Sequence, residues 1–94
     1  MSFLDKQKQL QELEEQLAKA KGQLSELTHF RKIVLAEQIL KAKQNGAKSI
    51  AEAEAIARAS EEYKTVCLGL AQATENEAIL WFKLKRLQRE LGIL

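Results

Sequence analysis

The sequence contains no proline, one cysteine and few aromatic residues. Its 94 residues include three Phe, one Trp and one Tyr, together with four glycines. Because proline interrupts helices, its absence leaves long helices unbroken. One cysteine excludes an intramolecular disulfide and a cysteine-cluster zinc site. A chain of this length has room for one domain, which we expect to cover residues 1–94.

Long apolar runs are also missing. No stretch of about 18 consecutive apolar residues occurs, so we expect no membrane-spanning helix. Asp5, Lys6 and Lys8 interrupt the region in which a secretory signal peptide would have its apolar segment, so we expect no such leader. A lone thiol is typical of a reducing compartment, and we therefore expect a cytoplasmic protein.

The composition favours long helices. Of the residues 46% are hydrophobic and 30% are charged, and the chain is rich in Ala, Leu, Glu, Lys and Gln. In the first half apolar residues recur at alternating steps of three and four, which is the repeat of a coiled coil and predicts a helix over about 3–44. Lys6 and Arg31 are the polar interruptions. The apolar residues on this frame are Phe3, Leu10, Leu13, Leu17, Ala20, Leu24, Leu27 and Val34.

A second repeat of the same kind runs through the other half. Because its frame passes Ser60 without a change of phase, we favour one continuous helix over about 50–91. The alternative is a short helix that ends at Ala59, with Ser60 capping a new helix that starts with Glu61 and Glu62. The residues on this frame are Ile56, Ala59, Tyr63, Val66, Leu70, Ala73, Leu80, Leu84, Leu87, Leu91 and Leu94, with Glu77 as the charged interruption.

The segment 45–49 is the predicted turn between these helices. Asn45 and Gly46 form a turn dipeptide, and glycine is the preferred residue where a helix ends in a left-handed conformation. Ser49 and Glu52 then fit a capping box, in which Ser49 accepts from the amide of Glu52 and Glu52 accepts from the amide of Ser49. The second helix is therefore expected to begin next to Ser49.

Two long helices joined by a tight turn predict an all-α fold, an antiparallel two-helix coiled-coil hairpin. Folding at the turn pairs Leu10 with Leu84 and Leu13 with Leu80. A hairpin has a single seam and leaves apolar residues outside it uncovered. We therefore expect a homodimer in which two hairpins form a four-helix bundle, or else a monomer with one apolar flank that binds a partner.

No group of residues has the spacing of a catalytic or metal-binding site. His29 is the only histidine, and a single ligand does not make a metal site. Cys67 would need a base, an orienting group and an oxyanion hole to act as a nucleophile. Phosphate-binding glycine loops and metalloprotease motifs are absent. We expect no enzyme, no catalytic or metal-ligating residue and no cofactor.

The candidate binding residues lie near the end of the chain, where aromatic and basic side chains follow one another. Such a segment is typical of a helix that docks on a protein, and the partner-binding residues would be Ile79, Trp81, Phe82, Lys85, Arg86 and Arg89. The alternative is nucleic-acid binding, in which the phosphate contacts come from Lys83, Lys85, Arg86 and Arg89. In a third interpretation the charges are a solvated face, and the two aromatic residues belong to the dimer core.

Residues 45–91 combine Gly46, Ala/Glu-rich runs at 49–54 and 59–63, and a basic heptad helix. In this combination they resemble small coiled-coil accessory proteins of temperate phages and prophages. The resemblance implies a non-enzymatic accessory that acts by protein–protein binding, such as an inhibitor or adaptor of a host nuclease, immune or recombination complex. The alternative that it implies is a recombination or replication accessory that binds nucleic acid through the basic helix.

Overall fold

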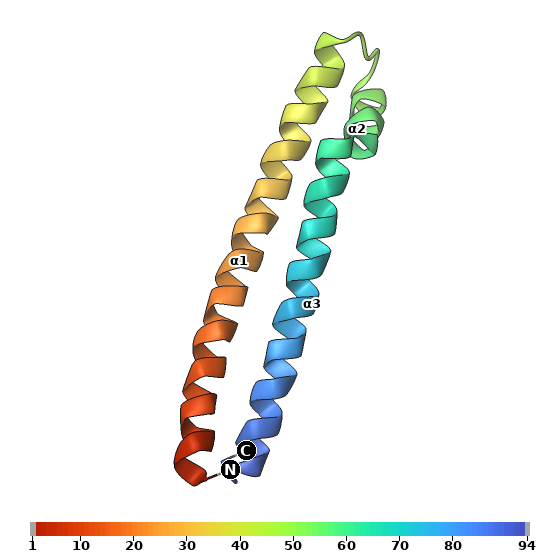
Figure 1. Ribbon diagram of the computed structural model, residues 1–94. Helices are drawn as coiled ribbons and strands as arrows, with labels where there is room; N and C mark the ends of the chain where they lie inside the picture. Colours follow the sequence, from red (N-terminus) through yellow and green to blue (C-terminus); the bar gives the residue numbers. More distant parts are fainter. Residues whose placement is uncertain (1, 94) are drawn as a thin grey trace. The chain divides into compact units, whose positions relative to one another are not determined.

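The computed structural model describes residues 2–93, and within them the chain is all-helical, with no strand. Its helices are α1 (Phe3–Gln44), α2 (Ile50–Ala59) and α3 (Glu61–Glu90) (Figure 1). The prediction of an all-α fold is therefore confirmed. Contacts divide the chain into two compact units, which we call the terminal unit (residues 2–24 and 73–93) and the central unit (residues 25–72).

A glycine ends α1 as the sequence predicts. Gly46 has a φ of 101°, in the left-handed region that glycine adopts without steric cost. Two backbone bonds close this helix end: the amide of Gly46 donates to the carbonyl of Lys43 at 3.2 Å, and that of Ala47 donates to Ala42 at 3.0 Å. This pair of bonds satisfies carbonyls that the end of a helix would otherwise leave unpaired.

The capping box at the start of α2 is present with one altered bond. The hydroxyl of Ser49 accepts from the amide of Glu52 at 3.1 Å, as predicted. The carboxylate of Glu52 accepts from the amide of Lys48 at 3.2 Å, whereas the sequence motif predicted the amide of Ser49 as its donor. Both bonds still satisfy backbone amides at the helix start, which fixes where α2 begins.

The prediction of one continuous helix over about 50–91 is wrong, because the helix breaks at Ser60. This residue has extended backbone, with φ −69° and ψ 149°. Its hydroxyl donates to the carbonyl of Ala57 at 2.7 Å and accepts from the amide of Tyr63 at 3.2 Å. One side chain thus ends α2 and caps α3, and Glu61 and Glu62 add negative charge to the first turn of α3.

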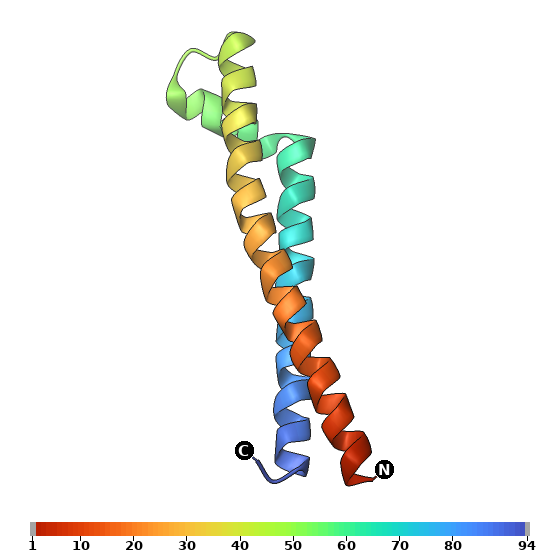
Figure 2. The same ribbon diagram turned by 90° about the vertical axis from the view of Figure 1, so that its left-hand side faces the viewer.

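The break changes which face of α2 is buried. Ala53 and Ala57 are 0% exposed, whereas Ile56, which the repeat assigned to the seam, is 48% exposed, and Ala59 is exposed as well. In the central unit α2 lies beside the C-terminal part of α1, where Ala42 is also buried (Figures 1 and 2). Small side chains allow helices to approach closely, so the buried face of α2 is made of alanines, and both of its isoleucines, Ile50 and Ile56, stay in solvent.

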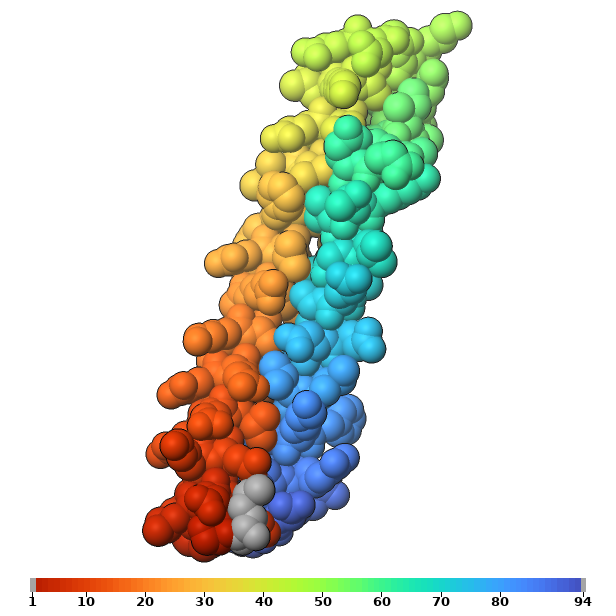
Figure 3. Space-filling model, viewed as in Figure 1, coloured from red at the N-terminus to blue at the C-terminus, as the bar shows by residue number. Residues whose placement is uncertain are grey.

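In the terminal unit α1 and α3 run side by side in opposite directions, and their side chains meet along the unit (Figures 1 and 3). The predicted seam is buried here: Leu17 and Ala20 on α1 face inward, as do Ala73, Leu84 and Leu87 on α3. Where α1 begins and α3 ends, Nζ of Lys6 lies 3.8 Å from a carboxylate oxygen of Glu90. Phe3 departs from the prediction, since it is exposed.

The pairing of the two helices in the terminal unit is displaced from the predicted register. Leu13 lies with Leu87 on the wall of one groove, whereas Leu80, its predicted partner, lines a separate hollow with Gln16 and Gln23. The predicted register assumed a tight turn followed by a helix that runs straight back. In the terminal unit, residues that come later in α3 than predicted lie beside Leu13 and Gln16 of α1.

Replacing Ser60 by alanine should lower the free energy of unfolding by about 1 kcal/mol, because the amide of Tyr63 loses its acceptor. Chemical denaturation followed by circular dichroism measures this change. Ser25→Ala is the matched control, since Ser25 is exposed inside α1 and caps no helix. Equal stabilities of the two variants would contradict the capping role of Ser60.

Replacing Ala57 by leucine should destabilise the protein by about 1–3 kcal/mol, because a larger side chain does not fit a fully buried position. Ala55→Leu places the same side chain on the exposed face of α2 and should leave the melting temperature nearly unchanged. If Ala57→Leu melts like Ala55→Leu, the close packing of α2 is refuted.

Candidate protein-binding surface

In the terminal unit α3 carries a second stripe of side chains on the side opposite to its buried seam. The stripe consists of Glu75, Ile79, Phe82 and Arg86, and we call it the α3 outer stripe. Its members are separated by steps of four, three and four, which align on one face of a helix with 3.6 residues per turn. All four are exposed, Ile79 by 46% and Phe82 by 60%, whereas Leu84 and Leu87 are buried on the other side.

An aromatic cluster borders this stripe. The rings of Trp81 and Phe82 meet edge to face, with centroids 5.0 Å apart and an interplanar angle of 87°. The Nζ atom of Lys85 lies 5.4 Å from the centroid of the Trp81 ring, within the range of a cation–π interaction. Trp81 remains 42% exposed. The two rings contact each other while much of their surface stays in solvent.

The structure divides the predicted partner-binding residues among three places on α3. Ile79, Phe82 and Arg86 belong to the outer stripe, and Lys85 is on the flank occupied by Trp81. Arg89 is exposed near the end of the helix. The predicted residues therefore do not form one surface. Phe82 alone belongs both to the outer stripe and to the aromatic cluster.

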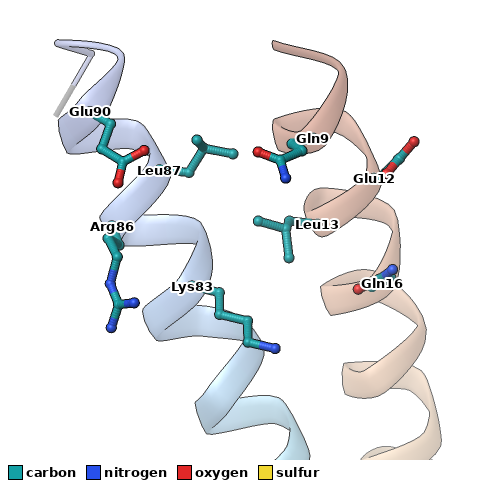
Figure 4. A pocket seen from close by; sticks show the side chains of 8 residues that line it. All are labelled: Gln9, Glu12, Leu13, Gln16, Lys83, Arg86, Leu87 and Glu90. Atoms are coloured by element: carbon teal, nitrogen blue, oxygen red, sulfur yellow. The ribbon is translucent and has the colours of Figure 1, made fainter. Parts of the chain in front are cut away.

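The basic residues proposed for nucleic-acid binding do not share one face. Lys83 lines a groove between α3 and α1, whereas Lys85 lies on the other flank against Trp81. Arg86 lines the edge of the groove and points away from α1 (Figure 4). A row of phosphates would need cations along one side; Lys85 and Arg89, four residues apart, share a side, but Lys83 lies on the opposite flank.

The groove that contains Lys83 has a volume of about 350 Å³ and lies in the terminal unit. Leu13 and Leu87 point into it from α1 and α3 (Figure 4). Its other lining residues are polar or charged: Gln9, Glu12, Gln16, Lys83, Arg86 and Glu90. Among residues 2–93 no cluster of histidine, cysteine and carboxylate side chains is placed to hold a metal ion.

The sequence pattern alone did not single out Glu75 as a member of this candidate surface, because an exposed glutamate does not stand out as an uncovered apolar residue does. The signal was present, because Glu75 precedes Ile79 by four residues and so continues the three-four step of Ile79, Phe82 and Arg86. Ile93 is also exposed, by 60%, but it lies beyond the end of α3 and after Gly92, whose φ is 74°.

No known protein family, curated protein or solved structure matches this chain. In the part of the chain that the structure describes, no helix is long and apolar enough to span a membrane.

Proposed function

We propose that this chain is a non-enzymatic protein that acts by binding another protein through the C-terminal half of α3. The observation that carries the proposal is the exposure of Ile79, Trp81 and Phe82 within four consecutive residues. Monomeric proteins rarely leave such large apolar side chains together in water, and patches of this kind mark interaction surfaces.

The chemistry of the patch suits a protein partner. Aromatic residues and arginine are enriched at the centres of protein interfaces, where they supply most of the binding energy. Here Phe82 lies next to Arg86 on the outer stripe, and Trp81 is held against Phe82 in an edge-to-face contact. Rings that already pack against each other lose less conformational freedom on binding, which favours affinity.

We further propose that the chain folds as an antiparallel hairpin and that two copies associate into a four-helix bundle. The terminal unit supports this proposal, since its two helices are antiparallel and share one buried seam. Four-helix bundles bury a second face of each helix, which is what the uncovered side of α3 requires. Self-association and binding of a foreign partner would then use neighbouring parts of the same helix.

The class of foreign partner follows from the resemblance of residues 45–91 to temperate-phage accessory proteins. It favours a host complex that acts on nucleic acids or in immunity, with this chain as its inhibitor or adaptor. Nucleic acid as the direct ligand is less well supported, because Lys83 and Lys85 lie on opposite flanks of α3.

Retention of a partner from a nuclease-treated lysate of the native host tests the proposal. The tagged chain should retain a stoichiometric protein that Trp81→Ala loses by about tenfold or more, a loss of the size expected at an interface hot spot. Leu4→Ala is the control, because Leu4 is also exposed but lies on α1. Circular dichroism shows that both variants keep their helices.

Loss of all retained material on nuclease treatment would contradict a direct protein partner. In that case binding should also fall steeply with added salt, because phosphate contacts release counterions. Equal retention by Trp81→Ala and Leu4→Ala would exclude the C-terminal half of α3 as the binding surface.

A further inference from the structure

We propose that a second copy of this chain covers the α3 outer stripe, with the two α3 helices antiparallel and Glu75 of each copy paired with Arg86 of the other. This inference rests on the self-association proposed above and specifies its interface. It follows from the order of side chains along the stripe, which has an acid at one end, two apolar residues in the middle and a base at the other end.

This order is complementary to itself when the helix is reversed. A two-fold axis that passes α3 between Leu80 and Trp81 puts Ile79 of one copy opposite Phe82 of the partner subunit. The same axis puts Glu75 opposite Arg86 of the partner subunit. Two-fold symmetry repeats each contact, so the interface has an apolar centre and an ion pair at either end.

The charges also exclude the parallel arrangement. In a parallel pair each residue meets its own copy, so Glu75 would face Glu75 and Arg86 would face Arg86. Like charges placed opposite one another oppose association, whereas the antiparallel pair contains only opposite charges. The sequence of charge along α3 therefore selects one direction of pairing.

Burial in the terminal unit supports the same arrangement. Ile79 and Phe82 are 46% and 60% exposed, although residues of their size and polarity are usually buried. In the antiparallel pair four such side chains, two from each copy, cover one another. Trp81 and Lys85 lie on the flank of α3 beside this contact, so these two side chains stay open to a different partner while Phe82 is covered.

Charge reversal tests the pairing through the dissociation constant of the dimer, measured by sedimentation equilibrium. Glu75→Arg alone and Arg86→Glu alone should each weaken the dimer by about tenfold or more, because each puts two like-charge contacts into the interface. The double variant Glu75→Arg with Arg86→Glu restores opposite charges and should bind within about threefold of the original chain.

Two substitutions on α1 serve as matched controls. Glu14→Arg and Lys8→Glu make the same charge changes at exposed positions of the terminal unit, away from α3. Neither should change the dissociation constant by more than about twofold at physiological salt. Circular dichroism of every variant separates lost association from lost folding, and recovery in the double variant gives the same separation independently.

The outcomes distinguish this inference from the function on which it rests. A dimer that both single variants leave unchanged would overturn the antiparallel pairing of α3 but keep self-association. A chain that is monomeric at every concentration would overturn the pairing and self-association together. In either case the retention experiment with Trp81→Ala still decides whether the chain binds a foreign protein.

Discussion

Two packed helices share only one buried seam, so in the terminal unit each helix has a side that the other does not cover. Leu84 and Leu87 on α3 are buried against α1, and no other helix of that unit covers the opposite side of α3. Apolar side chains placed there stay in water until another chain arrives, at a free-energy cost of roughly 25 cal/mol for each Å² of apolar surface. Ile79 and Phe82 occupy that side and are exposed, which is the observation behind the proposed association.

The residue types near the turn predicted where α1 ends and where α2 begins. They did not predict which face of α2 is buried. Gly46 and Ser49 act through bonds to their own neighbours, so their residue types were enough to predict the helix stop and the helix start. Ser60 offered the same kind of signal, but the unbroken three-four repeat favoured a continuous helix. That repeat records which positions are apolar and contains no information about a change in helix direction.

The sequence predicted which segment of the chain contains the candidate binding residues, but not how these residues are arranged around α3. Exposed aromatic and basic residues from Ile79 to Arg89 could be identified from their types alone. Their division among an outer stripe, an aromatic flank and a groove depends on where α1 lies, and the register of α1 and α3 in the terminal unit differs from the predicted one. The spacing of Glu75 from Ile79 was visible in the sequence, but its place on an uncovered side of α3 follows only from the structure.

Different sides of α3 thus have different chemistry: a buried seam, an outer stripe with ordered charges, and a flank where Lys85 lies against Trp81. The most direct test of this account is the melting temperature of the unaltered chain over a hundredfold range of concentration. If association covers the outer stripe, the melting temperature rises with concentration by several degrees, because mass action stabilises the associated state. A melting temperature independent of concentration, together with a monomeric mass, would contradict the account.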